Sequence, residues 1–309
     1  MLYDFIEQCV LYRTYCIKNG WVSQQMEKNR FAIFYAILAA ALYAINAPLS
    51  KLLLKDIPTT FMAGLLYLGA GTGMYIVQKF SKNRDKQVIP KKEMPYTVAM
   101  VVLDIAAPIC LMIGLAQSSA ASASLLNNFE IVATSIIALA VFKEKISKRL
   151  WLAIVLITAS SIMLSMEDIQ SFSFSIGAVF VLLACICWGF ENNCTRKLSN
   201  NNPAQIVVIK GFGSGIGAIA VALVIGERYF DVWHILLAML LGFVAYGLSI
   251  YYYIYAQRFL GAAKTSAYYA VSPFIGALMS LIIFAEIPSV IFVMALAVMA
   301  AGAYFAIDG

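Results

Sequence analysis

The sequence predicts an all-α membrane protein with ten transmembrane helices, arranged as two inverted five-helix repeats. Of the 309 residues, 62% are hydrophobic and only 12% are charged, and the apolar residues fall into blocks. A soluble domain is usually about 25% charged, so this chain has too few charges to coat a soluble fold. A bilayer core needs roughly 20 apolar residues per helix, and lipid excludes irregular backbone. A third observation, an internal repeat, predicts the arrangement of the helices.

Ten apolar blocks mark the expected spans, and the connections between them are short. The expected spans are 31–54, 59–79, 95–116, 120–141, 149–166, 173–195, 205–226, 233–256, 261–284 and 287–306. The net charge of +6 comes from Lys and Arg residues that lie mostly in the connections. This placement is typical of membrane topology and does not indicate a nucleic-acid partner.

The basic residues also predict the orientation in the membrane. Most of them fall on the side of the N-terminus, including six between Lys79 and Lys92, whereas the other side holds only Lys51, Lys55 and Arg228. Because basic connections stay in the cytoplasm, we expect both termini there and a multi-pass protein of the cell membrane.

The chain divides into an N-terminal cytoplasmic extension, 1–28, and two repeats, 29–168 and 169–309. The extension has two readings, an interfacial amphipathic helix or a segment without a role. The helical period behind the first reading is carried by Leu2, Phe5, Ile6 and Cys9.

Several local matches between the halves occur in the same order. The segment Tyr43–Lys51 aligns with Trp188–Arg196 at an offset of 188 − 43 = 145 residues, and both halves have a glycine-rich second span. Each fourth span ends in Phe-X-Glu, at Glu144 and at Glu286. Because five spans per half is an odd number, the halves must insert in opposite directions. Inverted repeats are typical of secondary transporters, which bind their solute near the bilayer midplane between the repeats.

From about Asn29 to Asp308 the chain resembles the drug/metabolite transporter superfamily, in its EamA-domain branch. The segments Tyr43–Lys51 and Trp188–Arg196 and the two glutamates carry this resemblance. It implies ten helices, cytoplasmic termini, a central cavity and transport of amino acids, metabolites, nucleotide sugars or drugs. These diffuse motifs identify the superfamily and not the solute. The acids Asp104 and Glu130 have no counterpart in the second half, so the resemblance gives them no role.

Ionisable residues inside membrane spans are rare and indicate functional sites. Asp104 and Glu130 lie about 14 and 12 residues from the turn between spans 3 and 4, so at 1.5 Å per residue they reach similar depths. If they face each other, one should hold a proton, and the pair would bind a coupling proton or a cationic group. The alternative is two separately satisfied acids, bonded to Asn127, Asn128 or backbone.

Glu191 and Lys210 lie at matching depths in spans 6 and 7, so we expect an ion pair between them. The pair has two readings, a structural clasp of the hairpin or a gate that anchors a charged group of the solute. Asn46, Asn192 and Asn193 are expected to add hydrogen bonds to this region.

Four deep aromatic residues are candidates for stacking on an organic solute: Tyr43, Trp188, Tyr246 and Tyr269. We assign the run Tyr251–Tyr255 to the interfacial aromatic belt instead.

The glycine spacings of spans 2 and 7 indicate close helix packing. His234 is expected at the surface.

The sequence predicts a non-enzymatic secondary transporter, with export as the favoured direction and a proton as candidate coupling ion. Its partners are a small organic solute, such as an amino acid or amine, and the lipid bilayer. A GxxxxGK[ST] phosphate loop is missing from the sequence, so we expect no cofactor and no ATP-driven step. Two alternatives stay open: a non-transporting sensor or channel subunit, and an intramembrane lipid-modifying enzyme. The sequence does not indicate the oligomeric state.

Overall fold

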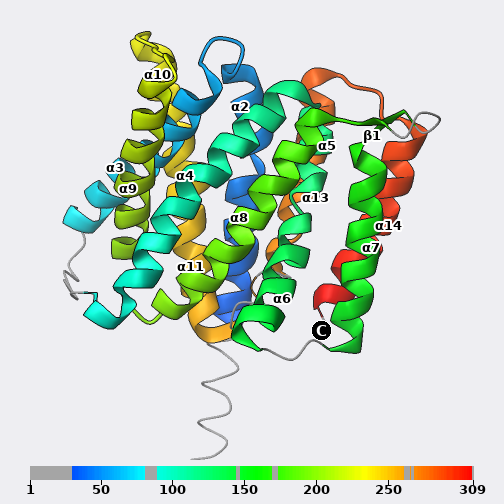
Figure 1. Cartoon of the computed structure of the whole chain (residues 1–309), viewed down its shortest axis with the longest axis horizontal. Helices are drawn as coiled ribbons and strands as arrows, with labels where there is room; N and C mark the ends of the chain where they lie inside the picture. Colours follow the sequence, from blue (N-terminus) through cyan, green and yellow to red (C-terminus); the bar gives the residue numbers. More distant parts are fainter. Residues whose placement is uncertain are drawn as a thin grey trace, which may run out of the picture.

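The computed structural model describes residues 30–80, 89–143, 147–168, 173–260, 265 and 268–307. The expected extension 1–28 and Glu144 lie outside these residues. Within them, the fold is a bundle of helices with one short β-ribbon (Figure 1).

The first half contains helices in the five ranges expected of it. These are the helix Arg30–Leu53, whose second part is α2 (Asn46–Leu53), then α3 (Thr59–Phe80), η1 (Lys91–Glu93), α4 (Met94–Gln117), α5 (Ala120–Leu126), α6 (Phe129–Phe142) and α7 (Lys148–Ser165). Strand β1 (Met166–Asp168) then pairs antiparallel with β2 (Ser173–Phe174).

The second half begins with β2 and is otherwise helical in its described residues. Its helices are α8 (Ile176–Leu198), α9 (Pro203–Val224), α10 (Val232–Gly242), the π-helical η2 (Phe243–Leu248), α11 (Ser249–Leu260), α13 (Ser272–Phe284) and α14 (Val290–Ile307).

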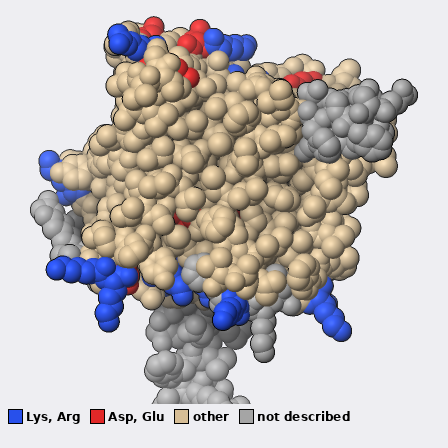
Figure 2. All heavy atoms as spheres, in the orientation of Figure 1, with Lys and Arg blue, Asp and Glu red and all other residues tan. Residues whose placement is uncertain are grey.

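Seven helices in the described part of the chain are long and apolar enough to cross a membrane. The apolar helices Ser272–Phe284 and Val290–Phe305 are shorter. A total of ten crossings in two inverted repeats therefore stays a prediction. The side of the bundle in Figure 2 is almost entirely uncharged, and most Lys, Arg, Asp and Glu atoms gather at its upper and lower ends. Large apolar side chains such as Ile216, Val155 and Leu278 are more than half exposed, as expected of a surface that faces lipid.

The packing joins the first half to the second along most of the bundle. Helix α3 packs against α9, α4 against α8, α5 against α13, and α7 against α14. Glycines allow the closest approach, as the sequence predicted: a Cβ on Gly211 would lie 2.3 Å from the Cα of Gly71. A Cβ on Gly69 would lie 2.0 Å from the carbonyl oxygen of Met239 in α10. These glycines therefore fix the distances between backbones.

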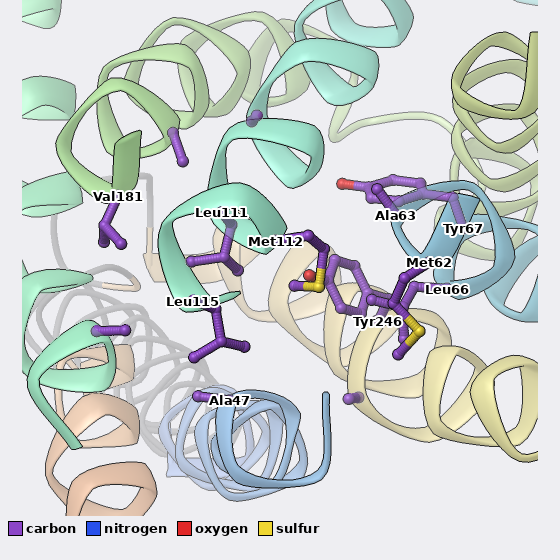
Figure 3. Close-up of a cluster of buried hydrophobic side chains, with 14 of the residues drawn as sticks. Ala47, Met62, Ala63, Leu66, Tyr67, Leu111, Met112, Leu115, Val181 and Tyr246 are labelled. Atoms are coloured by element: carbon purple, nitrogen blue, oxygen red, sulfur yellow. The ribbon is translucent and has the colours of Figure 1, made fainter. Parts of the chain in front are cut away.

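A buried apolar cluster fills the region where α2, α3, α4, α8 and α10 meet (Figure 3). Leu66, Leu111, Met112 and Leu115 are fully buried in it. Tyr67 and Tyr246 lie beside Met112 at one edge of this cluster, and their rings contact each other. The apolar cluster thus packs directly beside the polar residues described below.

Several spans are interrupted within the ranges that the sequence predicted for them. The first breaks at Ile45, because Pro48 cannot donate a hydrogen bond to the carbonyl of Ala44. The fourth breaks at Asn127 and Asn128, between α5 and α6. The eighth contains the π-helical segment η2. In the ninth, Pro273 lies in the first turn of α13, directly after a turn at Ala270 and Val271. The first three interruptions lie near mid-length of their spans, and polar side chains gather at that depth.

Candidate functional site

A cavity at mid-depth is lined by all four ionisable residues that the sequence placed inside the spans: Asp104, Glu130, Glu191 and Lys210. We call it the central cavity, and its volume is about 50 Å³. Its lining residues are Tyr43, Tyr67, Asp104, Glu130, Trp188, Glu191, Asn192, Thr195, Lys210, Tyr246, Ile250, Tyr253 and Tyr269. A single water needs roughly 10–15 Å³ and organic ligands occupy about 300–1,000 Å³. In this conformation the cavity therefore has room for a few waters, and a solute can enter only if its walls move.

Lys210 lies at the centre of a buried charge cluster. Its Nζ lies 2.9 Å from Oε1 of Glu191 and 3.2 Å from Oδ2 of Asp104. Tyr67 donates a hydrogen bond of 2.8 Å to Oδ1 of Asp104, and Thr195 donates to Glu191. Asp104, Glu191 and Lys210 are all less than 5% exposed. The ion pair expected between Glu191 and Lys210 is therefore present, and Asp104 is a second acid in contact with the same ammonium group.

Local sequence explains how the helices present these groups. The side chain of Asn202 caps α9 by accepting from the backbone N–H of Ala204, and Pro203 occupies the first turn. Lys210 follows two turns later, about 10 Å into the helix. On α4, Pro108 cannot donate to the carbonyl of Asp104, four residues earlier, so the helix loses a hydrogen bond beside this carboxylate.

Glu130 has a different environment from the other two acids. It lies in the first turn of α6, directly after the break in the fourth span, and its Oε1 accepts a 2.6 Å hydrogen bond from Nδ2 of Asn192. Asn192 also donates to Thr134 at 3.3 Å. The hydrogen-bond partner of Glu130 is thus a neutral amide, whereas Asp104 and Glu191 share an ammonium group.

Aromatic rings form one wall of the central cavity. The ring of Tyr43 lies 5.6 Å from that of Tyr246, 5.8 Å from that of Tyr269 and 6.4 Å from that of Trp188. Tyr269 lies 5.0 Å from Tyr253 in the same wall. Edge-to-face packing of this kind holds the rings in place, and an aromatic wall can contact a cation or a flat group.

Comparisons with known proteins agree with this architecture. The model of the EamA-like transporter family matches residues 30–166 and again residues 175–307. The chain belongs to this family. An uncharacterized transporter of Methanothermobacter thermautotrophicus is 22% identical over 270 residues, which cover 81% of this chain and 78% of that protein. A solved structure titled "Crystal structure of protein" has a TM-score of 0.68 at 14% identity, covering 89% of this chain and 95% of that one, so it supports the fold alone.

The sequence left open whether Asp104 and Glu130 face each other or are satisfied separately. In this EamA-family chain they have separate partners: Asp104 contacts Tyr67 and Lys210, and Glu130 contacts Asn192. The depth estimate gave the position of each acid along its helix and not the direction of its side chain. Both acids nevertheless line the central cavity.

The amides of the EamA-family site also have other partners than expected. Asn46 donates to the hydroxyl of Tyr246 at 3.3 Å and accepts from Ser50, away from the charge cluster. Asn193 donates to the carbonyls of Thr134 and Gly189 and so joins α8 to α6. Asn127 and Asn128 lie at the break of the fourth span and line a smaller cavity next to the central one.

Four residues of the central cavity were not predicted: Tyr67, Thr195, Ile250 and Tyr253. Thr195 follows Glu191 by four residues on one helix, and this spacing could have indicated a contact. Tyr253 belongs to the run assigned to the aromatic belt, but it is buried and faces inward, while Tyr252 stacks on Tyr35. Tyr67 carried no signal in the sequence.

Lys51 joins the ends of α2 and α4, on the side of the bundle that the positive-inside pattern assigns to the outside. Its Nζ donates to the carbonyl oxygens of Leu115, Ala116 and Ser118 at 2.6, 3.0 and 2.8 Å. An ammonium group at the C-terminus of α4 satisfies the last carbonyls of the helix and complements its dipole. The end of α2 is thereby fastened to the end of α4.

Proposed function

We propose that this EamA-family protein is a secondary transporter that moves small organic solutes with a cationic group, such as amino acids or amines, by alternating access. The two halves are proposed to form inverted repeats around the central cavity, and the double match of one family model supports this arrangement. Export from the cytoplasm is the proposed direction, on the resemblance to the family. A proton is the proposed coupling ion.

The charge balance of the central cavity carries the proposal. Three carboxylates line it, those of Asp104, Glu130 and Glu191, and Lys210 is the one ammonium group among the described lining residues. With every group ionised, the cavity holds two negative charges in excess. Buried charge of one sign is unfavourable unless a counter-charge or a proton neutralises it. A cationic solute or a proton can supply this neutralisation, and the aromatic wall suits an organic cation.

Glu130 is the proposed contact for the cation or proton, because Lys210 already lies against the other two acids. The ionisable groups that share the cavity with Glu130 are Tyr43, Tyr67, Asp104, Glu191, Lys210, Tyr246, Tyr253 and Tyr269. A proton and the ammonium group of a solute would compete for the carboxylate of Glu130. Exchange of one for the other would couple solute movement to a proton gradient.

Alternating access requires that one end of the cavity closes while the other opens. The small volume of the central cavity and the Lys51 contacts at the proposed outer end support a closed outer side in this conformation. The helix interruptions at the depth of the cavity are suitable points for bending.

The proposal is tested by solute flux into proteoliposomes that contain the purified protein. We expect uptake of an amine or amino acid that saturates with concentration and changes with an imposed pH gradient. Glu130→Gln keeps the size of the side chain and removes its charge, so the response to the pH gradient should disappear. The matched control is Glu93→Gln, since Glu93 also accepts a 2.6 Å hydrogen bond from an asparagine, Asn201, but does not line the cavity.

An unchanged pH response in Glu130→Gln would sink the proton-coupling part of the proposal. Absence of saturable flux for every amine and amino acid tested would favour a sensor or channel subunit, and chemical conversion of a lipid would favour the enzyme alternative.

A further inference from the structure

A second, smaller cavity adjoins the central cavity at the break of the fourth span. We call it the side cavity, and its volume is about 20 Å³. Its lining residues are Tyr43, Asn127, Asn128, Glu130, Ile131, Tyr269, Ala270 and Pro273. Tyr43, Glu130 and Tyr269 line both cavities, so a molecule bound at Glu130 can extend one group into the side cavity.

Asn128 is the unusual residue of the side cavity. It is 1% exposed, yet neither its Nδ2 nor its Oδ1 has a hydrogen-bond partner in the part of the chain that the structure describes. Other buried asparagines of the bundle, Asn46, Asn192 and Asn193, all have partners. A buried amide left without partners costs about 1–3 kcal/mol per group, so an occupant of the side cavity would relieve a real penalty.

The charge next to Asn128 restricts what that occupant can be. A carboxylate would accept from Nδ2 but would leave Oδ1 without a donor, since an ionised carboxylate has no proton to give. It would also bring a negative charge beside Glu130, two residues further along the chain. A neutral group that both donates and accepts, such as a carboxamide or a hydroxyl, satisfies both atoms of Asn128 and adds no charge.

We infer that the transported solute is an amine that also carries a neutral hydrogen-bonding group, with its ammonium at Glu130 and its carboxamide or hydroxyl at Asn128. The inference rests on the proposed function and narrows its substrate class, because zwitterionic amino acids should bind less well than their amides or alcohols. The side cavity of about 20 Å³ accommodates one water-sized group such as a hydroxyl, and a carboxamide fits when the walls move apart as solute entry already requires.

Four probes of one carbon skeleton test the inference by calorimetric titration of the purified full-length protein. They are leucinamide, leucinol, leucine and isoamylamine, which differ only in the group that replaces or omits the carboxylate. A neutral hydrogen bond changes affinity by roughly threefold to tenfold, so leucinamide and leucinol should bind that much more tightly than isoamylamine. Leucine should bind more weakly than leucinamide.

Substitutions at Asn128 connect this preference to the side cavity. In Asn128→Leu the affinity ratio of leucinamide to isoamylamine should fall to about one, and in Asn128→Ser, which keeps a donor and an acceptor, part of the ratio should remain. The ratio is measured within each variant, so a smaller folded fraction does not change it. Asn193→Leu is the matched control, because Asn193 is a buried amide that lines neither cavity, and it should keep the wild-type ratio.

The outcomes separate this inference from the proposed function. If the amines bind and Glu130→Gln weakens all of them, but leucinamide and isoamylamine bind equally, the inference is wrong and the side cavity holds only water. A tighter affinity for leucine than for leucinamide also overturns it and leaves the proposed function standing. If none of the four probes binds, the proposed function fails for amines and the inference fails with it.

Discussion

The charge balance of the buried cluster depends on one residue, Lys210. It is the shared partner of Asp104 and Glu191, and all three side chains are shielded from water. A buried ion pair contributes little net stability relative to apolar residues of the same shape, because desolvation offsets the attraction. Removal of one partner is strongly destabilising, since it leaves the other charges buried without compensation. In the proposed mechanism Lys210 balances charge at Asp104 and Glu191, so that Glu130 stays available to the solute.

At this scale we predict that Lys210→Met lowers the free energy of unfolding by about 3–5 kcal/mol, because two buried carboxylates lose their shared counter-charge. Chemical unfolding in detergent micelles measures the change. The control combines Lys210→Met with Asp104→Asn and Glu191→Gln, which leaves no net charge in the cluster and should recover most of the loss. Equal stability of the single variant and the wild type would contradict the assignment of Lys210 as their counter-ion.

Three spans of the bundle are interrupted at the depth of the central cavity. Span 1 breaks at Ile45, span 4 at Asn127 and Asn128, and span 8 changes to a π-helix over Phe243–Leu248. In α2, which follows the first break, Lys51 holds the end of α4 by three hydrogen bonds. The break in span 1 is therefore a suitable point for bending, next to an end that is held in place.

We predict that Lys51→Met loosens the end of α4 and leaves its middle unchanged. Amide hydrogen exchange should become faster for the segment 115–119 and stay the same around Leu111, since only the last carbonyls lose their donor. Lys55→Met, which removes an exposed lysine one turn further on, serves as the control and should leave the exchange of both segments as in the wild type. Protection at 115–119 that does not change in Lys51→Met would show that these hydrogen bonds do not hold the helix end.

The whole molecule depends on contacts between its halves. The pairs α3 with α9, α4 with α8, and α7 with α14 each join one half to the other, and Gly71 with Gly211 sets the closest approach. The central cavity takes Asp104 and Glu130 from the first half and Glu191 and Lys210 from the second. Neither half therefore contains a complete site or a complete packing surface.

This dependence predicts that neither half folds alone. Residues 1–170 expressed without 171–309 should aggregate in detergent, because the glycine faces of α3 and α4 would have no partner. Co-expression of the two pieces should give a complex that elutes as one species in size-exclusion chromatography. A monodisperse, helical first half on its own would contradict the prediction.

The sequence by itself determined the class of the protein, the approximate position of each helix and the residues that deserve attention. Partitioning of about 20 apolar residues into a bilayer depends on composition and length, which are local properties. Glu191 and Lys210 could be paired from their equal distances to one hairpin turn, and the glycine spacings indicated close packing.

Only the tertiary structure decided which way the side chains face. Counting residues gives a position along a helix axis at 1.5 Å per residue, but it leaves the rotation about that axis undetermined. Asp104 therefore points to Lys210 and not to Glu130, and Tyr253 points into the bundle and not to the interface. Asn128, whose amide finds no hydrogen-bond partner among the described residues, lies where the fourth span breaks, which residue counting did not indicate either.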